Sequence, residues 1–142
     1  MKKEKTTKEL LGAWVCDLAN LLMEEECVTR SDAFKRAYLV RDLLENLGQG
    51  KVTFQYMKQN GESREAMGTL RMGIDPKFDA YEYKEDVKTN QHADSLNFTY
   101  WDLEKKGFRT FSAARVVKII AVAIPNYKEH ELHESHELIE FV

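Results

Sequence analysis

Residues 51–70 have the sequence KVTFQYMKQNGESREAMGTL, and residues 97–112 have the sequence NFTYWDLEKKGFRTFS. In the first stretch Val52, Phe54 and Tyr56 alternate with Thr and Gln side chains, a period of two that is typical of a strand with one buried face. Each stretch has turn-forming residues near its middle, so each predicts a β-hairpin. Two hairpins separated by an irregular insert predict a small β-barrel.

The turn of each hairpin is also marked in the sequence. Asn60 and Gly61 both tolerate a positive φ, which predicts a tight two-residue primed turn in the first hairpin. In the second hairpin we expect a third strand over residues 96–103, a turn over residues 104–107 and a fourth strand over residues 108–112.

The segments around the hairpins complete this barrel. Residues 113–115 predict a short helical turn, and the β-branched run at residues 116–124 predicts a fifth, largely buried strand that Pro125 closes. Residues 71–95 contain glycine, an Asp-Pro pair and a mixed-charge run, which predicts a long insert or loop. We therefore expect a five-stranded SH3-like or Sm-like barrel over residues 50–124.

Two amphipathic helices precede the barrel. Residues 6–26 begin with a capping box and carry apolar side chains at helical spacing. Ser31 and Asp32 offer an N-cap for a second helix that ends at Gly48. Residues 1–49 thus predict a helical hairpin, and the fold class is α+β. The wide apolar stripe of the first helix needs a cover, either the barrel or another copy of the chain, and so favours a homo-oligomer.

Length and composition limit the class of protein. A chain of 142 residues fits one domain, with the helical hairpin, the barrel and a C-terminal tail in one compact unit. The longest apolar run, at residues 119–124, is far shorter than the roughly 20 residues that cross a bilayer, so we expect no membrane partner. The basic N-terminus lacks an apolar signal core, which predicts a cytoplasmic protein.

Charge and cysteine content narrow the class further. The formal net charge of −3 argues against duplex nucleic acid as a partner, because duplex binding relies on many Lys and Arg side chains that neutralise phosphates. Cys16 and Cys27 would lie roughly 16 Å apart along a helix that rises 1.5 Å per residue. That distance is too long for a disulfide, so we expect buried or inert thiols.

A family resemblance rests on the two hairpin stretches. The pattern VTFxYxKxNGxxRxAxGTL at residues 52–70, with FTYWDLEKKGFRTF at residues 98–111, resembles the WYL-like family of Sm-like SH3 barrels. The resemblance covers roughly residues 50–122, and residues 33–38 are similar to the helical lead-in of several members. It implies a protein of phages or mobile elements of gut bacteria, acting in the bacterial host cytoplasm. The family has no established reaction or catalytic residues to transfer.

The tail at residues 125–142 is acidic and contains His130, His133 and His136. Imidazole with carboxylate is a common ligand set for transition metals, but the i, i+4 histidine pair of a zinc-protease helix is missing. We therefore expect no metal site at these histidines. Instead we expect the tail to form a charged helix that docks through Leu132 and the apolar residues near its C-terminus. The sequence also has no Gly-x-Ser-x-Gly motif and no phosphate-binding glycine loop, so we expect neither an enzyme nor a cofactor.

The aromatic side chains of the hairpins are the better candidates for a site. More of them are present than one small barrel holds, since alternation puts Tyr100 and Trp101 on opposite faces of one strand. An exposed ring beside a cation would form a stacking platform with a phosphate clamp. The candidate ligand-binding residues are Tyr56, Lys58, Arg64, Tyr100 and Arg109. The alternatives are that the helices cover the outward rings, and that the two arginines pair with Glu65 and Asp102 across strands.

Three functions from different classes follow from these observations. The first is a non-enzymatic protein that binds and sequesters a small anionic ligand, most readily a nucleotide-type signal. The second is a regulator that binds nucleic acid, against which the acidic charge balance counts. The third is an oligomeric module for protein interaction, which uses the first helix and the tail.

Overall fold

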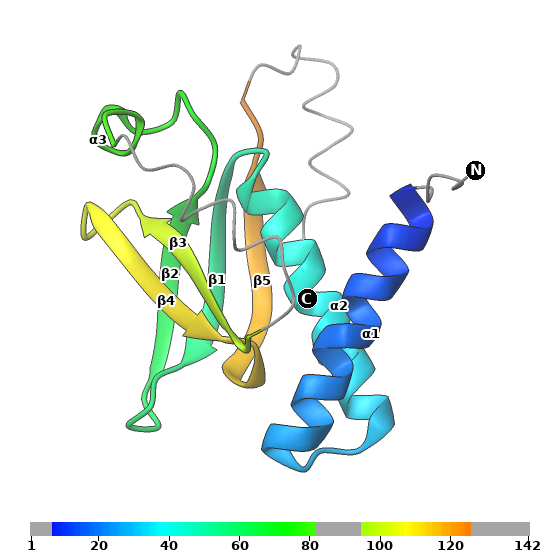
Figure 1. Ribbon diagram of the computed structural model, residues 1–142. Coiled ribbons are helices and arrows are strands. Elements are labelled where there is room, and N and C mark those ends of the chain that lie inside the picture. Colours follow the sequence, from blue (N-terminus) through cyan, green and yellow to red (C-terminus); the bar gives the residue numbers. More distant parts are fainter. Residues whose placement is uncertain (1–6, 82–94, 126–142) are drawn as a thin grey trace.

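A computed structural model describes residues 7–81 and 95–125 of the chain. Figure 1 shows two helices beside a five-stranded sheet. The helices are α1 (Thr7–Glu26), α2 (Arg30–Leu47), the short α3 (Pro76–Asp79) and the 3-10 turn η2 (Ala113–Arg115). The strands are β1 (Lys51–Met57), β2 (Ser63–Thr69), β3 (Asn97–Asp102), β4 (Gly107–Ser112) and β5 (Val116–Ala123).

The strands form one antiparallel sheet in the order β4-β3-β2-β1-β5. This arrangement confirms the predicted α+β class, with a helical hairpin followed by five strands and a helical turn before the last. The sheet is open rather than a closed barrel, because no pairing joins β4 to β5 within the residues that the structure describes. The two open edges of the sheet are therefore β4 and β5.

The helical hairpin covers one face of the sheet. Helix α2 packs on β1 and β5, and α1 packs on α2 and reaches η2 (Figure 1). From Trp14 onward the apolar stripe of α1 is covered within the chain, since Leu18 and Leu22 are fully buried and Trp14 contacts Phe98 with ring centroids 5.9 Å apart. The predicted start of α2 was two residues late, because its N-cap is Thr29, whose hydroxyl accepts a hydrogen bond from the Asp32 N–H at 3.2 Å.

The first hairpin turns through a three-residue loop, so the predicted two-residue primed turn was wrong. The Lys58 N–H donates to the Glu62 carbonyl at 2.8 Å, and the Gly61 N–H donates to the Lys58 carbonyl at 3.0 Å. Only Gly61 has a positive φ, at 86°, whereas Asn60 does not. This pattern is typical of a hairpin loop in which glycine takes the left-handed position. Asn60 instead uses its side-chain oxygen to accept from the Glu62 N–H at 2.9 Å.

Strand β5 was expected to be largely buried, and that expectation was wrong. It is an edge strand, and only Val116, Ile119 and Val122 of its eight residues are buried. The β-branched run at residues 116–124 therefore does not bury both faces of this strand. Two irregularities in its pairing with β1 shift the register and break the simple alternation.

The strand buried on both faces is β3. On the helix side, Phe98 and Tyr100 join the main core with Phe54 and Phe111. On the other side, Trp101 is fully buried against Phe78 of α3, with ring centroids 5.6 Å apart. The leucine-rich helices were the expected cover for the outward rings, but Trp101 is covered instead by α3, which lies inside the segment predicted as an insert or loop.

A buried carboxylate fastens α3 to the sheet. Asp75 caps α3 by accepting from the Lys77 N–H at 3.0 Å. Its other oxygen accepts from the Trp101 indole N–H at 2.8 Å and from the Lys106 ammonium at 3.1 Å. These bonds outweigh the effect of burial and hold the pKa of Asp75 below its ordinary value.

The close approach of β2 to β3 generates a prediction about stability. A Cβ at Gly68 would lie 2.5 Å from Cδ2 of Tyr100 and 3.0 Å from the Trp101 carbonyl oxygen. Gly68→Ala is therefore expected to destabilise the fold by about 1–3 kcal/mol, because a packed core has no room for the methyl group. Urea unfolding followed by circular dichroism measures the change.

The matched control is Gly12→Ala. Gly12 lies exposed inside α1, and nothing stands within 4 Å of the position its Cβ would take. Alanine there is expected to stabilise by up to about 1 kcal/mol through helix propensity. Equal effects of the two substitutions would contradict the close packing of β2 on β3.

Candidate functional site

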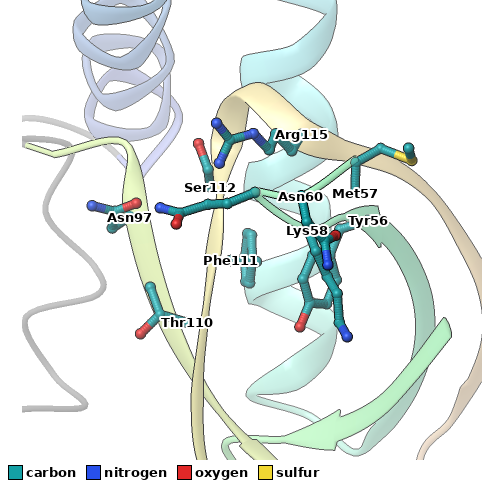
Figure 2. Close-up of a pocket in the computed structure, with 10 residues that line it drawn as sticks. Tyr56, Met57, Lys58, Asn60, Asn97, Thr110, Phe111, Ser112 and Arg115 are labelled. Atoms are coloured by element: carbon teal, nitrogen blue, oxygen red, sulfur yellow. The ribbon is translucent and has the colours of Figure 1, made fainter. Parts of the chain in front are cut away.

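A cleft of about 500 Å³ opens where the ends of β1 and β4 face each other (Figure 2). We call it the β1–β4 cleft. Its lining comes from the end of β1, the hairpin loop, the first residue of β3, the end of β4 and the end of η2. The lining residues are Tyr56, Met57, Lys58, Gln59, Asn60, Asn97, Thr110, Phe111, Ser112 and Arg115.

The lining of the cleft is cationic although the chain is acidic. Lys58 and Arg115 are both exposed, and within the described residues neither side chain forms an ion pair. None of the ten lining residues is Asp or Glu. A chain of net charge −3 therefore presents a cleft with two positive charges and no carboxylate in its wall. Such a wall attracts anions.

The floor of the cleft is aromatic. Tyr56 and Phe111 pack together with ring centroids 6.2 Å apart, and they are only 6% and 2% exposed. The two rings thus expose little of their surface to the cleft. Asn97, Thr110 and Ser112 add amide and hydroxyl groups that donate and accept hydrogen bonds.

Beneath the floor, a chain of hydrogen bonds fixes the Tyr56 ring. Arg64 and Tyr100 both donate to the carboxylate of Asp102, Tyr100 at 3.3 Å. Because an ionised carboxylate only accepts, the single Tyr100 hydroxyl hydrogen is used there. The Tyr56 hydroxyl, 3.1 Å from the Tyr100 oxygen, must therefore be the donor in their bond.

Asp102 is the fully buried centre of this network. Burial alone would raise its pKa, but hydrogen bonds from the Lys105 N–H and Arg64, together with the Arg64 charge, lower the pKa of Asp102 below its ordinary value. The pKa of Tyr100 is raised, first by burial and then by Tyr56 and Asp102, so its hydroxyl keeps its proton. The same carboxylate accepts from the N–H groups of Glu104 and Lys105, which shapes the turn between β3 and β4.

The five predicted ligand-binding residues separate into two groups. Tyr56 and Lys58 line the β1–β4 cleft. Tyr100 is fully buried, and Arg64 is paired with Asp102, as the cross-strand alternative anticipated. Arg109 is exposed on β4 outside the lining, and its guanidinium donates to the Phe108 carbonyl at 3.1 Å.

Sequence reasoning missed Arg115, which supplies the second cation of the cleft. The predicted helical turn at residues 113–115 was correct, and Ser112 caps it by accepting from the Ala114 N–H at 3.2 Å. That turn directs the chain from β4 to β5 and carries Arg115 beside the end of β1. Only the fold brings these two segments together.

Other candidate residues do not join this site. Cys16 and Cys27 are free thiols and both are exposed, so the expected burial was wrong. His130, His133 and His136 lie outside the described residues, and within those residues no three potential ligands gather into a metal site. Along the same described segments, every helix is too short or too polar to traverse a lipid bilayer.

The buried network generates a prediction about pH. Because the pKa of Asp102 is lower in the folded chain than in the unfolded chain, its ionisation stabilises the fold at neutral pH. That contribution is complete above the unfolded value of about 4 and is lost as the pH falls through the folded pKa. Asp102→Asn is expected to cost about 2 kcal/mol at pH 7 and to make stability less dependent on pH below 4.

The control for this variant is Asp42→Asn, whose carboxylate pairs with Arg41 at 3.4 Å and is 45% exposed. Exposed pairs contribute about 0–1 kcal/mol, so little change is expected. Unfolding curves measured between pH 2 and 7 make the comparison. A parallel pH dependence for Asp102→Asn and the unsubstituted chain would contradict the stabilising role of the Asp102 charge.

Comparisons with known proteins bear on the fold. No curated protein and no solved structure gave a significant match. A family model described as WYL_2, Sm-like SH3 beta-barrel fold, matches residues 40–117, more than half of the chain. The match runs from within α2 through the first four strands to the start of β5, and so includes the whole lining of the β1–β4 cleft. The chain therefore belongs to the WYL_2 family of Sm-like SH3 β-barrel folds.

Proposed function

We propose that this chain binds a small anionic ligand of nucleotide type in the β1–β4 cleft. The observation that carries the proposal is the charge of the lining, with Lys58 and Arg115 and no carboxylate in an acidic chain. Ammonium and guanidinium groups that form no ion pair within residues 7–81 and 95–125 are ready to pair with phosphate oxygens. Tyr56 and Lys58 keep the roles that the sequence suggested, and Arg115 replaces Arg64 and Arg109 as the clamp.

The remaining chemistry of the lining favours a nucleotide over a bare inorganic anion. The volume of about 500 Å³ lies within the range of small-molecule sites, roughly 300–1,000 Å³. Asn60 and Asn97 offer amides that match the donors and acceptors of a base or a sugar.

The lining supports binding without chemical conversion. Among the residues that the structure describes, the lining contains no Asp, Glu, His or Cys, the side chains that most often act as general base or carry a low-pKa nucleophile. We propose that the protein holds its ligand unchanged and thereby withholds it from other proteins, as a phage or mobile-element product that sequesters a host signal would do. Incubation with a bound nucleotide followed by mass spectrometry is expected to return the nucleotide intact.

Binding is tested by thermal shift with a library of mononucleotides and dinucleotides. A ligand present at a hundred times its Kd stabilises the protein by about 2.7 kcal/mol, which raises Tm measurably. Lys58→Ala and Arg115→Ala are each expected to weaken binding about 10-fold or more, because each removes a charge-assisted hydrogen bond. Titration calorimetry measures the affinities.

Arg109→Ala is the matched control, since it removes an exposed cation from β4 that does not line the cleft. Its affinity is expected to equal that of the unsubstituted chain. If Arg109→Ala lowered the affinity as much as Arg115→Ala, the ligand would bind outside the cleft. A library that leaves Tm unchanged, while single-stranded oligonucleotides bind, would instead support the nucleic-acid alternative.

A further inference from the structure

The two cations of the β1–β4 cleft stand apart rather than together. Figure 2 shows Arg115 at the η2 end of the cleft lining and Lys58 near Tyr56 toward the other end, with Asn60 between their labels. We infer that the ligand carries two phosphoryl groups at separate positions, one for each cation. This inference rests on the proposed function and names the class of nucleotide that the cleft selects.

The backbone under each cation is held by hydrogen bonds. On one side, Lys58 is fixed at the base of the hairpin loop, where its N–H donates to Glu62 and its carbonyl accepts from Gly61. On the other side, η2 is capped by Ser112, and the Ala113 N–H donates to the Leu96 carbonyl at 2.7 Å. The fold therefore sets the spacing between the two cation-bearing segments before any ligand binds.

Because the backbone segments that carry the two cations are held in place, we expect the affinity for a ligand to depend on where its phosphoryl groups lie. A single phosphate engages one cation and leaves the other side of the cleft with an unpaired charge. Two phosphoryl groups joined directly, as in a diphosphate, lie close together, so we expect them to pair mainly with one cation. Phosphoryl groups on opposite sides of a ribose reach both cations, and the ribose then passes the amide and hydroxyl groups of Asn97, Thr110 and Ser112. The affinity of the cleft is therefore expected to depend on the separation of the ligand's phosphoryl groups as well as on their number.

The Arg115 guanidinium and the Lys58 ammonium are expected to bind phosphoryl groups in different ways. Arg115 offers a planar fork that binds a terminal phosphate with two parallel bonds. Lys58 offers a point charge on a flexible stem, which follows a phosphoryl group over a wider range of positions. Arg115 therefore restricts the position of its phosphate more than Lys58 does, and replacing Arg115 by lysine is not conservative.

The experiment compares three adenosine nucleotides by titration calorimetry with the full chain. Adenosine 5′-monophosphate has one phosphoryl group, adenosine 5′-diphosphate has two at one end, and adenosine 3′,5′-bisphosphate has two at separate positions. We expect the bisphosphate to bind about 10-fold or more tightly than either of the others. Lys58→Ala and Arg115→Ala should each reduce its affinity to that of the monophosphate, whereas Arg109→Ala should leave the order of the three ligands unchanged.

Each result has a distinct meaning. Equal affinities for the diphosphate and the bisphosphate would overturn the two-position inference and leave the proposed function standing. A tighter diphosphate that loses affinity only in Arg115→Ala would place all the charge at one side, with the same consequence. If none of the three nucleotides nor any dinucleotide binds, the proposed function itself fails. A retained preference for the bisphosphate in Lys58→Ala and Arg115→Ala would also overturn the inference, because other groups would then be reading the charges.

Discussion

Strand β3 is buried on both of its faces, and much of the structure covers one face or the other. Tyr100 and Trp101 are adjacent in sequence, point to opposite faces and are both fully buried. A strand alternates its side chains, so each face needs its own cover. The helical hairpin and the inward side chains of the sheet provide the first, and α3 with its Asp75 cap provides the second. Gly68 on the neighbouring strand leaves room for the Tyr100 ring.

The same constraint makes the polar interior necessary. A buried tyrosine hydroxyl needs a partner, and the Asp102 carboxylate supplies it while Arg64 balances the charge. Through Tyr100 the network also holds the Tyr56 hydroxyl, so the floor of the β1–β4 cleft is anchored in the core. The cleft itself exists because the sheet stays open and β4 does not pair with β1 within the described residues. A floor anchored in this way would lower the cost of ordering protein side chains when the proposed ligand binds.

Charge distribution connects this scaffold to the proposed function. Net charge describes the chain as a whole, whereas a ligand meets the local wall, and here the two have opposite signs. The acidic balance disfavours long nucleic acids, whose many phosphates meet the wider surface. A small ligand meets only the cleft. Membership of the WYL_2 family describes the fold, and the proposal about a ligand rests on the lining residues themselves.

Periodicity and capping in the sequence alone determined both long helices, all five strands and the turn at residues 113–115, because these depend on near neighbours or on hairpin partners. Tertiary structure alone decided that β5 is an edge strand, that α3 covers Trp101, and that Arg115 faces Lys58 across a cleft. Burial and convergence depend on which distant segments pack together and on how far the sheet closes, and no local pattern encodes either. For that reason the sequence pointed to Tyr56 and Lys58, which line the cleft, but it also proposed Arg64 and Arg109, which do not line it, and it missed Arg115.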